Sequence, residues 1–334
     1  MIFTQTPFRL SFFGGGTDYL PFFMEHGGSV LSTTINKYCY VAMRRLPPFF
    51  DYHTSVKYSK TEHVRKTEDI EHPLVRNCML YTGVHNLNIA YDADLPAHSG
   101  TGSSSSFAVG LLQSMYAMKG QFSDKRKLAE DAVHVERVLC NESGGWQDQI
   151  AAAYGGLNRI DFDSTGFHIN PIIITKSRKE DLQGRLMMFF TGISRISAVV
   201  AVEQTAAIKD KTAELIEMKK IVDTAEQILV NGDDINEFGR LLDYTWQIKR
   251  SLTNSISTDY IDDIYATAKK AGALGGKLMG AGGGGFVVLF AEPEKQTAIR
   301  KALHNLVYVP FEFESDGSRI VYYHSDEYDY EEQE

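Results

Sequence analysis

No part of this sequence restricts the fold as strongly as a glycine- and serine-rich stretch that runs directly into apolar residues. Residues 95–106 read LPAHSGTGSSSS, and the chain continues as FAVGLL. Glycines one residue apart permit positive φ and close approach of a ligand, and serine side chains cap helices well. We therefore expect a helix that begins here, with an anion such as phosphate at its positive end. A flexible loop without a ligand is the alternative, and the Gly-Lys-Ser/Thr ending of a Walker A loop is absent.

Length and charge narrow the class of protein. A chain of 334 residues with 43% hydrophobic residues is long enough for two domains. Its net charge of −9 argues against a nucleic-acid partner, and the acidic residues 326–334 resemble a solvated tail. Three widely spaced cysteines suit reduced thiols. Because no signal peptide and no apolar run of about 20 residues is found, we expect a cytoplasmic protein without a membrane partner.

A second glycine-rich segment lies near the start of the chain. The segment Pro7–Tyr19 predicts a short strand that ends in Gly14-Gly15-Gly16, followed by Thr17 and Asp18. Three glycines allow a ligand or another backbone to come close, and the carboxylate can accept hydrogen bonds from hydroxyl groups. A plain turn in which Asp18 caps the next helix is the alternative.

The remainder of the first half predicts alternating strands and helices. Residues 29–46 and 52–60 favour antiparallel strands joined through Pro47-Pro48, and a helix over 74–87 precedes a strand over 88–94. Ser123 is expected to cap a helix whose apolar stripe is Leu128, Ala132, Val135 and Leu139. Glu136 lies beside this stripe and could be an ordinary surface residue.

Asp148 stands in an unusual setting for a surface acid. The segment 141–149 reads NESGGWQDQ and predicts a glycine turn that opens a short helix, with Asp148 in its first turn. A favourable interaction with the helix dipole would explain the acid without any chemistry. Strands over 157–162 and 167–174 then complete a first domain.

The second half predicts an α+β domain. A strand over 185–190 precedes helices near 197–230, 233–252 and 258–271, to which core packing and no chemistry is assigned. Glycines at 280, 282 and 285 match G-x-G-x-x-G, but they lead into the apolar strand 286–290 rather than a helix, which excludes a dinucleotide-binding turn. A helix near 293–306 and strands near 308–314 and 318–324 follow.

Together, three ordered motifs resemble those of the GHMP kinase family. They are Pro7–Asp18, residues 96–104 (P-x-x-x-G-L-G-S-S, with Thr101 in place of an apolar residue) and residues 277–285 (K-L-x-G-A-G-G-G-G). The resemblance implies a two-domain α+β fold. Residues 1–178 would form an N-terminal domain like domain 2 of ribosomal protein S5, and residues 179–334 a C-terminal ferredoxin-like α/β domain.

Subfamily features are similar to those of bacterial D-glycero-D-manno-heptose 7-phosphate kinases. They are Gly14–Asp18 and the segment 191–195, Thr-Gly-Ile-Ser-Arg. Fucokinases have a related first motif, whereas galactokinases carry Gly-Glu-His-Thr-Asp there. Asp148 matches the catalytic aspartate of the galactokinase motif Met-Asp-Gln. Glu136 stands twelve residues upstream, as does the magnesium-binding glutamate of galactokinases.

The resemblance also implies roles for individual residues. Asp148 would accept the proton of the sugar's anomeric hydroxyl, with Arg9 stabilising its carboxylate and easing charge on the γ-phosphate. Mg²⁺ would be held by Glu136 with Ser103 or Ser104. The residues expected to bind ATP are Gly100, Thr101, Gly102, Ser103, Ser104, Ser105, Gly282 and Gly283, and those expected to bind the sugar are Gly15, Gly16, Thr17 and Asp18.

An acidic protein needs a local basic group for a sugar phosphate, and Arg195 is the first candidate. Lys37, Lys176 and Arg178 are weaker candidates, and an ion pair between Arg195 and Glu203 is the structural alternative.

The function implied is ATP- and Mg²⁺-dependent phosphorylation of the anomeric hydroxyl of D-glycero-D-manno-heptose 7-phosphate. Its product, the 1,7-bisphosphate, would supply nucleotide-activated heptose for cell-surface polysaccharide. Other readings are another sugar-1-kinase such as L-fucokinase, a non-catalytic sugar sensor, and a mevalonate-pathway decarboxylase on the same fold. A small-molecule sugar phosphate is the expected partner, and assembly as a homodimer is left open.

Overall fold

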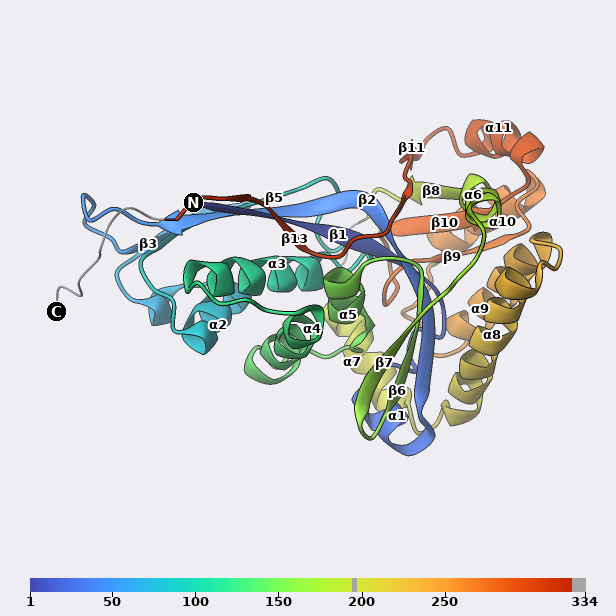
Figure 1. Cartoon of the computed structure of the whole chain (residues 1–334). Coiled ribbons are helices and arrows are strands. Elements are labelled where there is room, and N and C mark those ends of the chain that lie inside the picture. Colours follow the sequence, from blue (N-terminus) through green and yellow to red (C-terminus); the bar gives the residue numbers. More distant parts are fainter. Residues whose placement is uncertain (194–196, 326–334) are drawn as a thin grey trace.

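The computed structural model describes residues 1–193 and 197–325, and its strands form two sheets (Figure 1). The larger sheet follows the order β13-β1-β2-β5-β3-β4, with β6 and β12 also paired to β2, and β7 paired to β6. Its strands are β1 (Ile2–Phe13), β2 (Gly28–Arg45), β3 (Thr54–Lys57), β4 (Thr61–Val64), β5 (Leu87–Ala93), β6 (Asn158–Asp163), β7 (Gly166–Pro171), β12 (Phe313–Glu314) and β13 (Arg319–Tyr323).

The long strands β1 and β2 form the centre of this sheet. They pair antiparallel from Ile2 opposite Met43 to Phe13 opposite Leu31. β2 spans 18 residues, and it pairs with β6 near its start and with β5 near its end. β1 ends at Phe13, where the glycines 14–16 turn the chain towards the cavity described below.

The expected pairing of residues 29–46 with 52–60 is wrong. β5 lies between β2 and β3, antiparallel to β2 and parallel to β3, and β3 pairs antiparallel with β4. The segment that leads into the serine stretch therefore takes an interior place in the sheet. Adjacency in sequence predicted the wrong neighbour because the pairing partner of β2 comes from about 45 residues later in the chain.

Helices α2 to α5 lie along one face of the larger sheet (Figure 1). The predicted helix after the serine stretch is confirmed as α3, and its residues Phe107, Leu111 and Met115 are buried. Burial of each such side chain stabilises the fold by about 1.5–3 kcal/mol. α3 packs on β1 and β2 and is flanked by the others, so its N-terminus is held rigidly at one end of the sheet. The four helices are α2 (Pro73–Thr82), α3 (Ser103–Met118), α4 (Lys125–His134) and α5 (Gln147–Tyr154).

The smaller sheet has the order β11-β8-β10-β9, and helices α9 and α10 pack on it. Its strands are β8 (Leu186–Phe190), β9 (Gly275–Leu278), β10 (Phe286–Phe290) and β11 (Val307–Tyr308). The described residues also contain α1 (Leu20–His26), α6 (Lys176–Gly184), α7 (Ser197–Ala207), α8 (Thr212–Asn231), α9 (Asn236–Arg250), α10 (Asp259–Lys270) and α11 (Pro293–Ala302). Helix α9 packs on β9 and β10, and α8 reaches β1 and β2 of the larger sheet.

Several expected boundaries differ from the structure. Asp124, not Ser123, caps α4, because its carboxylate accepts a hydrogen bond of 2.7 Å from the Lys127 backbone N–H. The helix expected over 197–230 is interrupted by a turn, which separates α7 from α8. The strand expected over 308–314 is two short strands in different sheets, β11 and β12.

The end of the described chain returns to the larger sheet. β12 pairs with β2, and β13 pairs with β1 on the side away from β2. These strands were expected to complete the second domain, whereas their pairing partners lie in the first half of the chain. The division into 1–178 and 179–334 stays a prediction. A search of the described helices found none with the length and apolar character to cross a bilayer.

Candidate active site

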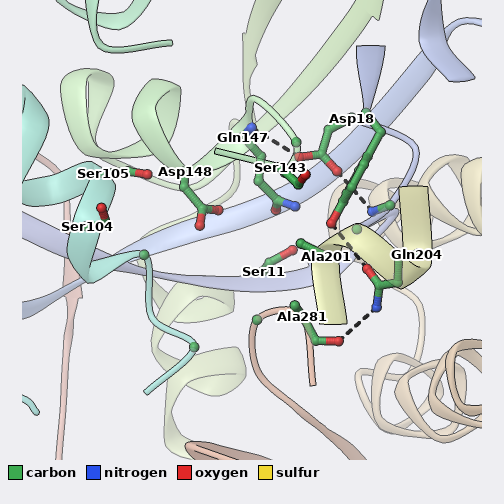
Figure 2. A pocket seen from close by; sticks show the side chains of 18 of the residues that line it. Ser11, Asp18, Ser104, Ser105, Ser143, Gln147, Asp148, Ala201, Gln204 and Ala281 are labelled. Carbon is green, nitrogen blue, oxygen red and sulfur yellow. Dashed lines mark hydrogen bonds between the residues drawn. The ribbon is translucent and has the colours of Figure 1, made fainter. Parts of the chain in front are cut away.

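A cavity of about 150 Å³ lies where the ends of β1 and α3 meet the glycine loop between β9 and β10. Figure 2 shows this cavity, with Ser104 and Ser105 on α3 at one end and Asp18, Gln204 and Ala281 at the other. Asp148 lies between these groups. The three motifs singled out in the sequence therefore converge on one space.

The serine stretch forms one wall of the cavity. Gly100 and Gly102 have φ of +83° and +79°, and Gly102 is the N-cap residue of α3. A Cβ at Gly100 would lie 2.4 Å from the Met279 carbonyl oxygen, so only glycine fits there. The N-terminus of α3 opens into the cavity and presents backbone N–H groups, a suitable environment for a phosphate.

The serine side chains do not cap α3, contrary to expectation, since no side-chain cap bond forms at its N-terminus. Instead, Ser104 Oγ and Ser105 Oγ donate hydrogen bonds of 2.8 and 2.7 Å to the two carboxylate oxygens of Glu136. The Gln149 side-chain amide also donates to Glu136. Ser103 lines the same cavity.

Glu136 is buried, with 1% of its surface exposed, which excludes the surface reading. It lies in a π-helical turn, Val135–Leu139, that continues α4. This turn changes the helical register, and Leu139 of the expected apolar stripe is exposed while Leu128, Ala132 and Val135 are buried. No salt-bridge partner for Glu136 is found in the described part of the chain. A buried carboxylate flanked by hydroxyl oxygens and lacking a cation suits a hard divalent cation such as Mg²⁺.

Arg9 and Asp148 form a two-point ion pair. Arg9 Nε donates to Asp148 Oδ1 and Nη2 donates to Oδ2, both at 2.8 Å, and Nη1 donates to the Gly100 carbonyl oxygen. Arg9 is buried in β1, whereas 24% of the Asp148 side chain is exposed, on the side of the cavity. A Cβ at Gly102 would lie 3.5 Å from Asp148 Oδ2, which places the acid directly beside the serine loop.

Asp18 does not cap the following helix. Tyr19 is the N-cap residue of α1 and makes no side-chain cap bond. Asp18 Oδ1 accepts from the Gly16 backbone N–H (2.9 Å), and Oδ2 accepts from the Gln147 backbone N–H (3.1 Å). Burial raises the pKa of Asp18, and the nearby charge of Asp148 acts in the same direction. Thr17 is buried, and its hydroxyl lies within hydrogen-bond distance of the Gly14 and Ser29 carbonyl oxygens, at 2.8 and 2.9 Å.

The third glycine motif contributes a strand that the sequence analysis missed. Residues 275–278 form β9, which was not predicted because two of its four residues are glycines. The predicted strand after the motif is confirmed as β10. Gly280 and Ala281 line the cavity. Gly282 and Gly283 instead lie against the Ile256 backbone and do not line the cavity. Their assignment to ATP binding stays a prediction.

Two buried lysines at the cavity, Lys249 of α9 and Lys277 of β9, were given no role from the sequence, although Lys277 begins the third motif. Lys277 Nζ donates to the Ser11 and Phe12 carbonyl oxygens, at 2.8 and 3.1 Å. Lys249 follows the buried Leu242, Thr245 and Trp246 on the inner face of α9. Lys249 follows Thr245 and Trp246 by four and three residues, which places it on the same helix face. This spacing could have revealed a buried lysine in the sequence, and lysine is rarely buried without a partner.

The proposed binding site for a distal phosphate stays a prediction. Arg195 lies outside the described residues. Arg178 donates to the Ile228 and Asp233 carbonyl oxygens, and exposed Lys176 lies 3.7 Å from Glu180. Neither these two residues nor Lys37 lines the cavity. Arg137, which the sequence analysis did not consider, does line it, and its guanidinium donates to the Gly145 carbonyl oxygen.

Comparison with protein families identifies both halves of the chain. The model of the GHMP kinases N terminal domain matches residues 70–156, and the model of the GHMP kinases C terminal matches residues 224–309. The chain belongs to the GHMP kinase family. Matches to both models in the expected order confirm the family prediction and the fold class.

Individual relatives of this GHMP kinase support the same relationship. The D-glycero-alpha-D-manno-heptose 7-phosphate kinase of Campylobacter jejuni is 27% identical over 321 residues, covering 90% of this chain and 92% of that protein. The crystal structure of a D-glycero-D-manno-heptose 1-phosphate kinase from Bacteroides thetaiotaomicron superposes with a TM-score of 0.79. It is 25% identical and covers 97% of this chain and 100% of that one. The Lactococcus lactis galactokinase, 16% identical with a TM-score of 0.73, shares the fold.

Proposed function

We propose that this GHMP kinase transfers the γ-phosphoryl group of ATP to the anomeric hydroxyl of D-glycero-D-manno-heptose 7-phosphate. The observation that carries the proposal is the Arg9–Asp148 pair, exposed to the cavity beside the N-terminus of α3. Phosphoryl transfer requires mainly positioning of the acceptor and neutralisation of charge. The Arg9–Asp148 pair would position the acceptor, and the N-terminus of α3 would neutralise charge on the phosphates.

The phosphates of ATP would lie against the serine loop. Backbone N–H groups at Gly102 to Ser105 would donate to the β- and γ-phosphates, favoured by the dipole of α3. Glu136 and Ser104 would provide oxygen ligands for Mg²⁺, with Ser103 or Ser105 as neighbouring hydroxyls. When bound, the ion would neutralise charge on the phosphates.

Asp148 would act as the general base. The anomeric oxygen attacks the γ-phosphorus, its proton passes to Asp148, and the bond from that phosphorus to the β–γ bridging oxygen breaks, releasing ADP. Arg9 keeps the carboxylate oriented through its two hydrogen bonds. Asp18, fixed by the Gly16 and Gln147 N–H groups, would accept hydrogen bonds from other sugar hydroxyls.

The heptose 7-phosphate acceptor rests on the Campylobacter jejuni relative and on the motif around Gly14–Asp18. The Bacteroides thetaiotaomicron structure is named for a heptose 1-phosphate, so the position of transfer needs its own measurement. L-fucose is the second candidate acceptor. A Bacteroides fragilis L-fucokinase/L-fucose-1-P guanylyltransferase is 23% identical over 91% of this chain, which spans 36% of that longer protein.

A panel assay tests the proposal. ADP release would be measured with heptose 7-phosphate, unphosphorylated heptose, L-fucose, galactose and mevalonate, and ³¹P NMR would locate the new phosphate. We expect the highest kcat/KM for heptose 7-phosphate and a product that carries phosphate at both C1 and C7. Preference for L-fucose would refute the heptose assignment, and ADP release with none of the acceptors would refute the sugar kinase itself.

A further inference from the structure

Lys249 is a buried cation that faces the cavity. It lies in the last turn of α9, only 5% of its surface is exposed, and it lines the cavity. Its ammonium group donates to one acceptor that the structure identifies, the carbonyl oxygen of Gly280. Three N–H donors are available on an ammonium group, so this arrangement leaves donors for a ligand. No salt bridge to Lys249 occurs within residues 1–193 and 200–325.

Among the described residues, the other lysine and arginine side chains of the cavity are already engaged. The charge of Arg9 is matched by Asp148 through two hydrogen bonds of 2.8 Å, and Lys277 points at the carbonyl oxygens that end β1. Arg137 donates to the Gly145 and Glu142 carbonyl oxygens and lies 3.9 Å from the Glu142 carboxylate. Lys249 is therefore the cation of this group that is available to a bound anion. Isolated buried charges are costly unless something compensates them, which favours a role with a ligand over a structural one.

Its surroundings identify the part of the substrate that it would meet. The charges of Arg9, Asp18 and Asp148 act on the pKa of Lys249. Gly280, which holds it, lies against the serine loop, since a Cβ there would be 2.5 Å from the Gly100 Cα. Lys249 thus lies near both the proposed base and the proposed phosphate loop. The phosphate at C7 of the sugar is many bonds away from C1, so this lysine does not suit that end of the acceptor.

We propose that Lys249 binds the phosphoryl group as it passes from ATP to the sugar, and stabilises the negative charge on its oxygens. This inference rests on the proposed function and adds a catalytic residue from α9 to the residues of the first half of the chain. A donor placed where charge develops contributes most in the transition state.

The protonation state of Lys249 should make the activity depend on pH. Burial lowers its pKa to about 8, and Arg9 acts in the same direction, opposed by Asp18 and Asp148. Burial also lowers the pKa of Lys277 of β9, which lines the same cavity together with Arg9, Arg137 and His98. Because protonated Lys249 is the proposed active form and its pKa of about 8 is that of the protein without substrate, kcat/KM should fall as the pH rises through that range.

Three variants test the inference. Lys249→Met removes the charge and keeps an unbranched chain, Lys249→Arg keeps the charge, and Lys270→Met makes the same change at an exposed lysine of α10. We expect Lys249→Met to lower kcat by about 10²- to 10³-fold, the loss for one preorganised donor, with smaller changes in KM. Lys249→Arg should recover part of this loss, and Lys270→Met should match wild type. The alkaline decline of kcat/KM should be absent in Lys249→Met.

A binding measurement separates this inference from the proposed function. Calorimetry would compare the Mg²⁺ complex of AMPPNP with MgADP plus aluminium fluoride, a mimic of the transferring group. Lys249→Met should bind the first like wild type and the second about 10²-fold more weakly. Equal binding of the mimic by both proteins, or an unchanged kcat and pH profile, would overturn the role of Lys249. A wild-type protein that phosphorylates no sugar would refute the proposed function, while the nucleotide comparison would still test Lys249.

Discussion

Replacement of Asp148 by Asn separates the proposed base from its structural pairing with Arg9. The variant keeps the size of the side chain and one carbonyl oxygen, but it cannot accept the proton of the sugar hydroxyl. We expect kcat to fall by about 10²- to 10⁴-fold, the range for loss of a general base. Binding of ATP should be little changed, because the two hydrogen bonds of Asp148 go to Arg9 and not to the serine loop.

The same change should also lower stability. Removing one partner of a fully buried ion pair costs about 3–5 kcal/mol. About a quarter of the Asp148 side chain is exposed and Asn retains one of the two hydrogen bonds with Arg9, so we expect a smaller loss of about 2–3 kcal/mol. Denaturant unfolding would measure this loss independently of activity.

The assay compares ADP release, ATP affinity and unfolding for wild type, Asp148→Asn and a matched control. Asp161→Asn is a suitable control, because Asp161 also pairs with an arginine, Arg159 at 2.9 Å, but lies on β6 away from the cavity. The control should keep its kcat. If folded Asp148→Asn turned over within about threefold of wild type, the general-base role would be refuted, since such a loss is far below the expected range.

Three further substitutions probe other parts of the site. Glu136→Gln should raise the Mg²⁺ concentration for half-maximal activity by about tenfold or more, whereas Glu130→Gln, on the exposed side of α4, should give the wild-type titration curve. Gly145→Ala should raise the KM for the sugar, because a Cβ there would lie 1.9 Å from Asp18 Oδ2; an unchanged KM would show that Asp18 does not bind the acceptor. Lys249→Met should raise the free energy of unfolding at pH 7. Its folded-state pKa of about 8 against 10.5 corresponds to at most about 3 kcal/mol, and the gain should shrink as the pH rises from 8 to 10.5. Equal denaturant midpoints at pH 7 would contradict this.

Local signals in the sequence predicted the elements that hold the site. The glycines before α3, its continuous apolar residues and the apolar strand after the third motif identified α3 and β10 correctly. Each of these signals depends on residues within one element. Asp148 was expected in the first turn of a short helix, and α5 places it there.

Signals that depend on distant parts of the chain were missed. Glu136 could be a surface residue by periodicity, because the π-helical turn that buries it is not visible in the apolar pattern. Lys249 lies in a predicted helix to which only core packing was assigned. Its role was missed because it depends on Gly280 and on the cavity, which are formed by distant parts of the chain. Likewise, the pairing of β12 and β13 with the larger sheet joins residues about 280 to 320 positions apart.

Glycine explains why three separate motifs could nevertheless be recognised as one site. A Cβ at Gly14 would lie 1.9 Å from the Ser29 carbonyl oxygen, and one at Gly285 would lie 2.2 Å from that of Ser99. The Gly285 contact and the contact between Gly100 and Met279 join the second and third motifs, whereas the Gly14 contact joins the first motif to the start of β2. Only glycine permits such a close approach, whatever the ligand is. The glycines of the motifs therefore mark the places where the loops meet. The chemistry comes from side chains next to these contacts, and Lys249, which has no glycine beside it in sequence, is linked to them through its hydrogen bond to the Gly280 carbonyl oxygen.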